Sequence, residues 1–499
     1  MKTLVALVVI AAVCFTSNAT AQSAPGKSGA ARSNAVTDAP LTSVQQDAID
    51  RYVTAEMARQ RIPGLAIGVY RRGYPFFLKS YGLANIEWQT PVGIDTRMQT
   101  GSLGKQFVAT AILRLAEQGK VDIDASITKY FPEAPASWRP ITVANLLSHT
   151  SGIGVYDTPE NTDPGGKFDY RQDFTEKELA AKISALPIDF KVGTDWRYNN
   201  TNYVMLGILV HRVTGKPHGD YLRDEFFTPL GMRSTRIISD TDVITRRASG
   251  YEIKAGELRN QQWVSATFNS TGDGTTYTTV EDMARWDRAL YDDTLLSPAS
   301  KNRMWTPFLL ANGKPNSAGY GFAWFVGAIN GHRTIEHGGA WQGFTSNMTR
   351  YPDDGLTVTA FVNLDSNHAR PNQIVQVVAG LVSPALMPPL ATPLADDPAR
   401  AKKLRTFLAR AAGGADLSAD FDVVAGYKPD PLAAKELAAA LPGSWLEAPM
   451  TLIRRANYFG GMRYGYRIGP AGNTRVLAAT IMPSGKLGEY AVLADPDNR

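Results

Sequence analysis

Cysteine is almost absent from this chain of 499 residues, in which Cys14 is the only one. It lies in a segment with the features of a secretory signal peptide: a basic start, an apolar run over residues 4–15 and an Ala-Thr-Ala cleavage sequence at 19–21. Cleavage after Ala21 would leave no cysteine, which excludes disulfides, thiol nucleophiles and cysteine-ligated metals. We therefore predict a signal peptide over residues 1–21 and a periplasmic or secreted protein. A lipid anchor on Cys14 is the alternative, although Val13 fits such an anchor poorly.

An excess of charge of one sign, long apolar runs and the commonest catalytic motifs are also missing. The 52 Lys and Arg residues nearly balance the 47 Asp and Glu residues, so we expect no nucleic-acid partner. The N-terminal apolar run is too short for an integral membrane span. The six histidines lack metal-ligand spacing, and no Gly-x-Gly-x-x-Gly, His-Glu-x-x-His or Gly-x-Ser-x-Gly motif occurs. We therefore expect no metal site.

The composition, 44% hydrophobic and 20% charged, is that of a globular chain of more than one domain. Residues 22–41 are small and polar and are predicted to be a flexible lead-in. Five prolines within residues 384–398 predict a linker, because neither a helix nor a central strand tolerates them. The predicted domains are therefore residues 42–383 and residues 399–499.

Strand signals lie at both ends of the first predicted domain, and helix signals lie between them. A capping box of Ser43 and Gln46 predicts a first helix, and other helices are predicted over 102–118 and 175–186. Strands are predicted at 65–70, 76–81, 320–326, 332–336, 344–351 and 356–363. This order indicates one sheet built from distant segments with a helical lobe between them, which is an α/β (α+β) fold.

The second predicted domain has its own pattern. Helical spacing of apolar residues occurs over 404–411, and strands are predicted at 462–468, 476–482 and 490–493. We expect a small α+β module. It contains no cluster of nucleophile and base, so it is more easily understood as structural than as catalytic. The sequence does not show whether it caps a site, forms a dimer or binds a partner.

Ser102 and Lys105 carry the strongest chemical signal. A separation of three residues on a helix places both side chains on one face, within hydrogen-bonding reach. The pair lies in the first turn of the helix predicted over 102–118. The positive end of the helix dipole and burial both disfavour an ammonium group there. The resulting fall in pKa allows the lysine to accept the proton of the serine hydroxyl.

This pair alone is a weak signal, because Ser126-Ile127-Thr128-Lys129 has the same spacing without a long apolar helix behind it. Two surface residues are the ordinary explanation of such a pair. Tyr198-Asn199-Asn200 is the only Tyr-x-Asn in the chain, and His337-Gly338-Gly339 follows the strand predicted at 332–336. Each alone is more often a packing or turn feature than a site. Their order along the chain, Ser-x-x-Lys, Tyr-x-Asn and His-x-Gly, changes the interpretation.

With these motifs, residues 45–382 resemble the serine hydrolases of the β-lactamase and penicillin-binding protein family. The resemblance is strongest to the branch of class C β-lactamases, DD-peptidases, D-amino-acid amidases and some esterases. It implies an antiparallel sheet flanked by helices, with a helical lobe. The tail resembles, more weakly, an accessory domain that follows some of these hydrolases. The matching stretches are Thr-Gly-Ser-Leu-Gly-Lys at 100–105, Leu-Leu-Ser-His-Thr-Ser-Gly at 146–152, Trp-Arg-Tyr-Asn-Asn-Thr-Asn-Tyr at 196–203, Pro-Leu-Gly-Met at 229–232 and His-Gly-Gly at 337–339, which leads into Gly343-Phe344.

The resemblance also implies roles for these residues. Ser102 would be the acylated nucleophile, Lys105 would activate it, and Tyr198 would be the proton relay or the base. Asn200 would hold Lys105 and the substrate amide. The oxyanion hole would use the backbone N–H groups of Ser102 and Ala340. Such chemistry needs neither a metal nor a cofactor, and the partner would be a small-molecule or peptide substrate.

Three departures from the family pattern bear on the substrate. Asn199 stands where relatives often have Ser or Ala, and Val192-Gly193 stands where they often have Pro-Gly. His337, which would orient Tyr198 or the substrate, stands where many relatives carry Lys. A carboxylate of a β-lactam or peptide would therefore lose a fixed positive partner. We accordingly expect an esterase, amidase or peptidase rather than a dedicated β-lactam resistance enzyme.

Two other interpretations remain open. A non-catalytic cell-wall-binding protein would have no need of an activated serine, and a slowly deacylating penicillin-binding protein would keep a stable adduct. Three aromatic residues, Tyr156, Trp263 and Trp341, are interpreted as core residues more readily than as substrate contacts. The acyl group, the leaving group and the oligomeric state are not shown by the sequence.

Overall fold

The computed structural model describes residues 40–499 except 255, 366–367, 423–444, 446, 459–460, 471–473 and 496–499. The predicted signal peptide, and residues 22–39 of the predicted lead-in, lie outside the described residues. Among the helices of the described ranges, none is long and apolar enough to cross a membrane.

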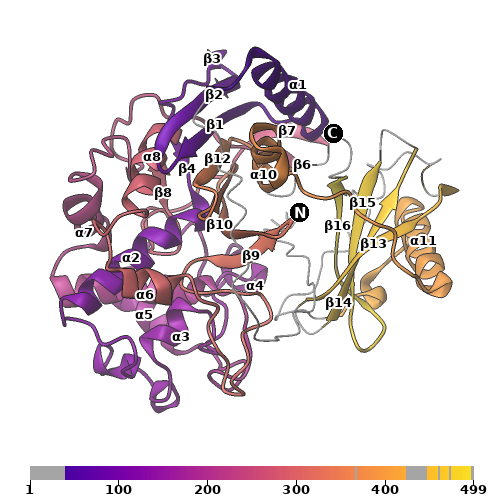
Figure 1. The fold of residues 1–499 in the computed structure, drawn as a ribbon. Coiled ribbons are helices and arrows are strands. Elements are labelled where there is room, and N and C mark those ends of the chain that lie inside the picture. Colours follow the sequence, from indigo (N-terminus) through magenta and orange to yellow (C-terminus); the bar gives the residue numbers. More distant parts are fainter. Residues whose placement is uncertain are drawn as a thin grey trace, which may run out of the picture.

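The largest sheet joins segments that are far apart in the sequence (Figure 1). Its seven strands are antiparallel in the order β3-β2-β1-β12-β11-β10-β9, and Leu65 of β1 pairs with Val362 of β12. This architecture confirms the fold class that the sequence predicts. The strands are β1 (Gly64–Arg71), β2 (Tyr74–Asn85), β3 (Thr90–Pro91), β9 (Phe325–Ile329), β10 (His332–Trp341), β11 (Phe344–Tyr351) and β12 (Leu356–Val362).

Both faces of the central strands of this sheet are buried, because alternate residues of β1 contribute to two different cores. Leu65 and Ile67 of β1 pack with α1 (Ser43–Gln60) and α10 (Pro371–Val382) on one face. Ala66 and Tyr70 point the other way, into the core shared with α2 (Lys105–Glu117) and α8 (Val280–Ala289). The sheet is thus the middle layer between two layers of helices.

Helix α1 begins one residue earlier than the sequence predicted. The capping box is formed by Thr42 and Gln45, whose side chain accepts a hydrogen bond from Thr42 N, and not by Ser43 and Gln46. Both pairs satisfy the same Ser/Thr-x-x-Gln pattern, so the local sequence does not choose between them. A capping box of Thr175 and Glu178 begins α5 (Glu176–Ser184), the helix predicted over 175–186.

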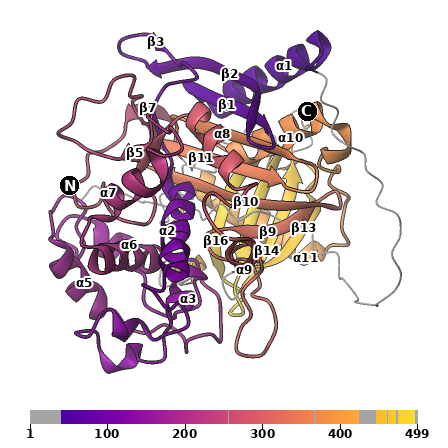
Figure 2. The same ribbon diagram turned by 60° about the vertical axis from the view of Figure 1, so that its left-hand side comes forward.

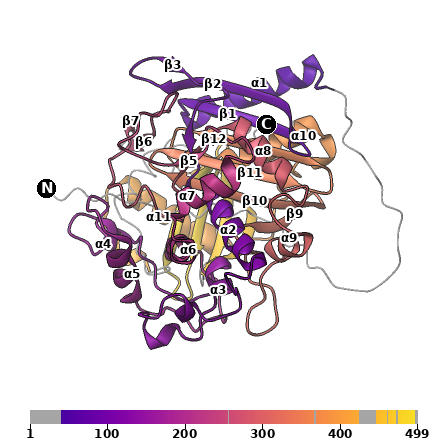
Figure 3. The ribbon, with the colours of Figure 1, turned by 90° about the vertical axis from the view of Figure 1, so that its left-hand side faces the viewer.

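A helical lobe lies against one face of the sheet, around α2 (Figures 2 and 3). Helix α6 (Asn200–Thr214) packs against both α2 and α3 (Val143–Leu147). The remaining helices of this region are α4 (Pro159–Thr162), α7 (His218–Leu222) and α9 (Pro298–Met304). Two small sheets complete it, one of β4 (Met98–Gln99), β5 (Arg236–Ile237) and β8 (Thr276–Thr278), the other of β6 (Tyr251–Lys254) and β7 (Glu257–Asn260).

The two strands nearest the candidate site, β10 and β9, differ from their predicted positions. Strand β10 continues to Trp341, so His337-Gly338-Gly339 lies inside the strand and not after it. Strand β9 begins at Phe325, and Tyr320, which was predicted to be in it, makes only an isolated bridge to Phe325. Glycine is unfavourable in a strand interior, which is why a sequence pattern ends the strand before Gly338.

A second antiparallel sheet follows in the C-terminal part of the chain, at the right of Figure 1. It consists of β13 (Thr451–Tyr458), β14 (Gly461–Ile468), β15 (Arg475–Ile481) and β16 (Leu487–Ala494), with α11 (Pro398–Ala412) packed on it. Strand β13 was not predicted. The connecting segment has one short 3-10 turn, Pro384–Leu386, and it touches the second sheet where Leu394 N donates to Leu452 O.

Candidate active site

The turn that carries Ser102 lies where α2 meets the end of β10. Ser102 is in a single 3-10 turn, Gly101–Gly104, and the α-helix begins only at Lys105, three residues later than predicted. The spacing still has the expected effect, because Lys105 Nζ donates a hydrogen bond to Ser102 Oγ at 2.9 Å. Gly101 has a φ of +52°, in the left-handed region, where a side chain is disfavoured.

Lys105 is a fully buried cation with three oxygen partners. Besides Ser102 Oγ, its Nζ donates to Asn200 Oδ1 at 2.7 Å and to the carbonyl oxygen of Asp273. Burial lowers the pKa of Lys105 to about 8, although the negative charges of Asp273 and Asp157 act in the opposite direction. The effect of burial was expected from the sequence, but these two carboxylates were not. Near pH 8, a substantial fraction of Lys105 is the neutral amine, which can accept a proton.

Asn200 is held at the first position of α6 by two interactions. The Asn199 side chain caps this helix by accepting from Thr201 N at 2.9 Å. Asn200 Nδ2 donates to Asp157 Oδ2 at 2.6 Å, which orients the amide so that its oxygen faces Lys105. Asp157 is buried, and burial raises its pKa to about 6. Asp157 is therefore a titrating carboxylate bonded to Asn200, which in turn binds Lys105.

We predict that Asp157→Asn shifts the pH dependence of any reaction that needs neutral Lys105 to lower pH. The substitution keeps an acceptor for Asn200 but removes a negative charge that raises the pKa of Lys105. The plateau of kcat/KM at high pH should stay within about threefold of the wild-type value, because no group that reacts is lost. Rates measured from pH 5.5 to 9.5 on both proteins check this. An unchanged midpoint would show that Asp157 exerts no field on the lysine.

Tyr198 lies beside the serine and the lysine, with its ring centre 5.1 Å from Lys105 Nζ. Its hydroxyl is buried near Ser102, whose side chain lowers the pKa of Tyr198 against the larger, opposing effect of burial. The net effect raises the pKa of Tyr198 well above its ordinary value. The phenol is therefore protonated in the resting site and can donate a proton more readily than accept one.

His337 contributes no positive charge to the site. Its Nδ1 donates to Gly338 O at 2.5 Å, so its Nε2 must accept from the hydroxyl of Tyr320, 3.1 Å away. Burial, followed by the charge of Lys105, lowers the pKa of His337 to about 3. Its ring centre lies 6.0 Å from that of Tyr198, and its hydrogen bond goes to Tyr320 instead.

A second buried histidine, His149, supports the tyrosine and was not found from the sequence. Its ring centre lies 4.4 Å from that of Tyr198, and its Nδ1 accepts from Asn199 N and Asn202 Nδ2. Burial lowers the pKa of His149 well below its ordinary value, so it too is neutral. His149 lies in the stretch 146–152 that carries the family resemblance, which was the only signal available for it.

The backbone of β10 lies directly against the nucleophile turn. A methyl group on Gly339 would overlap Thr100 O and lie 2.7 Å from Leu103 N and 2.8 Å from Ser102 N. Likewise, a methyl group on Gly101 would overlap the amide nitrogen of Ala340. The backbone of Gly339 and Ala340 is therefore adjacent to the turn that carries Ser102, as an oxyanion hole formed by the N–H groups of Ser102 and Ala340 would require.

The three aromatic residues named from the sequence have different environments. Tyr156 is buried and donates to Asp273 Oδ2 at 3.0 Å, so it supports the loop that binds Lys105. Trp341 is half-buried, with its Nε1 bonded to Asn269 Oδ1 at 3.0 Å. Trp263 is 60% exposed, so its interpretation as a core residue is wrong. It lies in a loop, where aromatic side chains need not be covered.

These features place the chain in a class of serine hydrolase-like folds, and the comparisons with known proteins agree. A family model described as beta-lactamase matches residues 49–380, and the chain belongs to this family. Penicillin-binding protein 4* of Bacillus subtilis (strain 168) is 28% identical over 302 residues, 58% of this chain and 65% of that protein. Protein flp of Staphylococcus aureus (strain MW2) is 25% identical over 341 residues, 66% of this chain and 65% of that protein. The chain thus matches slightly less than two thirds of the length of these relatives.

Solved structures extend the likeness. D-amino acid amidase from Ochrobactrum anthropi SV3 is 25% identical, with a TM-score of 0.59 over 69% of this chain and 99% of that chain. An octameric penicillin-binding protein homologue from Pyrococcus abyssi has a TM-score of 0.60 over 92% of this chain and 97% of that chain. At 19% identity, the second match shows the fold alone. Because this match covers 92% of the chain, it includes residues of the C-terminal sheet.

Proposed function

We propose that this protein is an exported serine hydrolase that cleaves an ester or amide through an acyl-enzyme on Ser102. The observation that carries the proposal is the buried lysine. Lys105 Nζ lies 2.9 Å from Ser102 Oγ, in a site whose burial lowers the pKa of the lysine to about 8. A surface Ser-x-x-Lys pair would have no such environment.

Acylation begins with neutral Lys105. It takes the proton of Ser102 Oγ while the oxygen attacks the substrate carbonyl, and the carbonyl π electrons move to oxygen. The backbone N–H groups of Ser102 and Ala340 stabilise that oxyanion, a contribution of roughly 3–4 kcal/mol per donor in other acyl-transfer enzymes. Tyr198 then donates its proton to the leaving group and recovers one from Lys105, as the bond to the leaving group breaks.

Deacylation uses the same groups in reverse roles. Neutral Lys105 takes a proton from water, with the Tyr198 hydroxyl as a relay that passes one proton on for each it receives. The hydroxide oxygen attacks the acyl carbonyl, and the proton returns from Lys105 to Ser102 Oγ when the ester bond breaks. Asn200 holds Lys105 by its oxygen and would offer the substrate amide a polar partner. His337, fixed by Tyr320, would line the site as a neutral group.

The substrate that fits best is an ester or an amide without a strict need for a carboxylate partner. The reason is that His337 is neutral, so Lys105 is the one group among the predicted site residues that can carry a positive charge. Lys105 is bonded to Ser102 and is therefore not free to bind a substrate carboxylate. The structural similarity to a D-amino acid amidase makes D-amino-acid amides the first substrates to try, with p-nitrophenyl esters and nitrocefin beside them. Nitrocefin turnover at the rate of a resistance enzyme would contradict this preference.

Covalent labelling tests the proposed nucleophile. A fluorophosphonate probe is expected to modify the wild-type protein at Ser102 and to leave Ser102→Ala unmodified, as read by mass spectrometry of the intact protein. Ser126→Ala is the matched control, because Ser126 has the same sequence spacing but caps a 3-10 turn through Thr128 N and should label normally. Equal labelling of wild type and Ser102→Ala would refute the assignment.

A slowly deacylating penicillin-binding protein is the second candidate, and the relative named penicillin-binding protein 4* supports it. The two functions share acylation and differ only in the second step. A benzylpenicillin adduct that persists for hours, with no turnover of esters or amides, would select the binding protein. A protein that is not acylated by either reagent would instead be a non-catalytic binder.

The location and the domains of the chain complete the proposal. We infer export from the signal peptide predicted over residues 1–21, and the N-terminus of the secreted protein, expected at Gln22, checks it. Residues 42–383 would form the hydrolase domain, residues 384–398 the linker, and residues 399–499 an accessory domain.

A further inference from the structure

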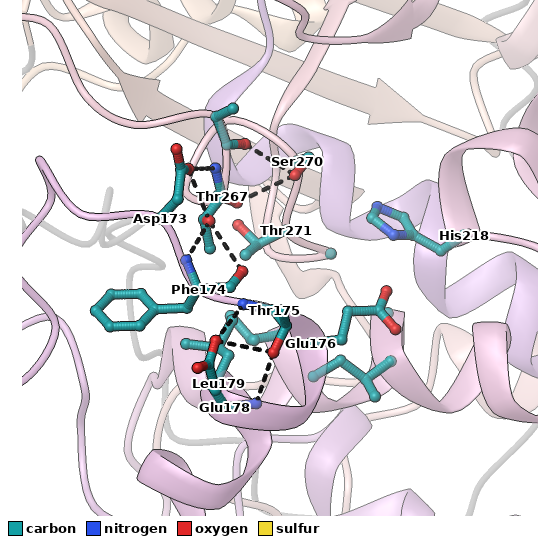
Figure 4. A pocket seen from close by; sticks show the side chains of 15 residues that line it. Asp173, Phe174, Thr175, Glu176, Glu178, Leu179, His218, Thr267, Ser270 and Thr271 are labelled. Carbon is teal, nitrogen blue, oxygen red and sulfur yellow. Dashed lines mark hydrogen bonds between the residues drawn. The ribbon is translucent and has the colours of Figure 1, made fainter.

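A cavity of about 460 Å³ lies beside the loop that leads to Asp273, the residue whose carbonyl oxygen binds Lys105. Figure 4 shows the side chains that line it. Helices α5 and α6, His218 at the start of α7, and the loop 266–272 surround it. Ser102, Lys105, Tyr198, Asn200 and His337 do not line it, so it is a different space from the candidate active site. Its size suits a molecule of about the dimensions of an aromatic amine.

The charge of this cavity has one sign. Three carboxylates, Asp173, Glu176 and Glu178, line it, and its lining includes no lysine or arginine. Hydrogen bonds from Thr267 lower the pKa of Asp173, and hydrogen bonds from Thr175 lower that of Glu178, so both are ionised at neutral pH. Glu176 is already bonded to His211 Nδ1 at 2.6 Å, so Asp173 and Glu178 are the carboxylates through which the cavity favours a cation.

His218 adds an unused polar group to the cavity wall. The residue is only 6% exposed, and its Nε2 is buried without a hydrogen-bond partner in the described structure. Burial lowers the pKa of His218 to about 4, so the imidazole is neutral and does not repel a cation. In Figure 4 its ring points from α7 toward the space between α5 and Thr271. An unpartnered buried nitrogen is costly, so a bound donor or acceptor there would be favoured.

Other ligand classes fit this cavity less well. An anion would need free donors, but the backbone amides of Thr175 and Glu178 at the start of α5 already donate to each other's side chains. A metal ion would need ligands converging on one point, and no cluster of three or more such side chains occurs in the described ranges. Part of the wall is apolar, from Phe174, Leu179 and Ile208.

We propose that this cavity binds a small organic ammonium ion that carries an apolar group. The ammonium group would lie at the acidic wall of the cavity, and the apolar group would contact Leu179 and Ile208. This assignment does not rest on the proposed function, because it concerns a separate cavity.

The cavity is connected to the candidate active site by two consecutive contacts. Thr271 lines the cavity and donates from Oγ1 to Asp273 Oδ1 at 2.5 Å. The carbonyl oxygen of Asp273 in turn accepts from Lys105 Nζ. A ligand that displaces Thr271 would therefore change the environment of Lys105, and we expect it to change the rate of acylation. This second part does rest on the proposed function.

Calorimetric titration of the full chain with benzylammonium chloride tests the binding. The Ser102→Ala protein is used, so that reaction at Ser102 does not contribute, and benzyl alcohol is the neutral control. Benzylammonium is expected to bind at least tenfold more tightly than benzyl alcohol. The combined variant Asp173→Asn, Glu176→Gln, Glu178→Gln should bind it about tenfold more weakly, since each exposed ion pair contributes little alone.

Two further variants separate binding from folding. Ser270→Trp would fill the cavity from its exposed edge and is expected to abolish binding without changing the melting temperature. Glu257→Gln, an exposed carboxylate outside the cavity, should leave binding unchanged. Equal affinity in the wild-type, combined and Ser270→Trp proteins, or no preference over benzyl alcohol, would overturn the site. If the acylation rate of the wild-type protein stays constant at saturating benzylammonium, the proposed effect on Lys105 is wrong. Binding in the cavity is tested separately by the calorimetry.

Discussion

The Lys105→Met protein is expected to lose kcat/KM by roughly 10²–10⁴-fold, the usual contribution of a positioned general base. Methionine fills a similar buried space but cannot accept the proton of Ser102 Oγ, which the lysine reaches at 2.9 Å. The loss should be in acylation, so the rate of labelling by a fluorophosphonate should fall by the same factor. A burst experiment separates this step from product release.

The fold of Lys105→Met should survive the change. The substitution removes a fully buried amine whose charged form is penalised by burial, and this gain offsets part of the loss of its hydrogen bonds to Asn200 and Asp273. Melting temperatures of the two proteins should therefore lie within a few degrees of each other. Lys129→Met is the control, because Lys129 is exposed and lies over the ring of Tyr130. Activity of Lys105→Met within threefold of wild type would exclude the lysine as the base.

Gly339→Ala is the second substitution with a large expected effect. The added methyl group would overlap Thr100 O and crowd Leu103 N and Ser102 N, all of them backbone atoms that cannot rotate away. Strand β10 and the nucleophile turn would have to separate, which moves the oxyanion-hole donors apart. We expect kcat/KM to fall by at least 10²-fold, as for the loss of one such donor, and the free energy of unfolding to fall by about 1–3 kcal/mol.

The control for this glycine is Gly413→Ala at the end of α11. A methyl group there would meet Ala409 O at 3.4 Å, an ordinary contact, and the backbone φ is −75°. This variant should keep full activity. If Gly339→Ala retained wild-type kcat/KM, the close approach of β10 to Ser102 would have no catalytic meaning.

The sequence was sufficient where local periodicity and spacing determine the structure. Strand β11 has the bounds predicted for it, because all of its residues are buried and it is bounded by turns. Ser102 and Lys105 come together because three residues make about one turn in either a 3-10 or an α-helix, so the error in the helix start did not matter.

The parts that could not be predicted depend on contacts between distant segments. Asp157 and His149 lie in irregular segments, and nothing in their neighbours shows that they face α6. Asp273 supplies a backbone carbonyl to Lys105, a group that every residue type has, so no residue pattern can reveal it. Gly339 of β10 is required because the strand packs closely against the turn that carries Ser102, and sequence periodicity does not reveal this contact.

The pH dependence of fluorophosphonate acylation tests most directly whether neutral Lys105 activates Ser102. Because the lysine must lose its proton to act, the rate should rise about tenfold per pH unit at low pH and level off above a midpoint of about 8. Tyr198 should give no second limb below pH 10, since burial raises its pKa well above the ordinary value. A rate that is flat from pH 6 to 9, or a midpoint at the ordinary pKa of an exposed lysine, would contradict the account.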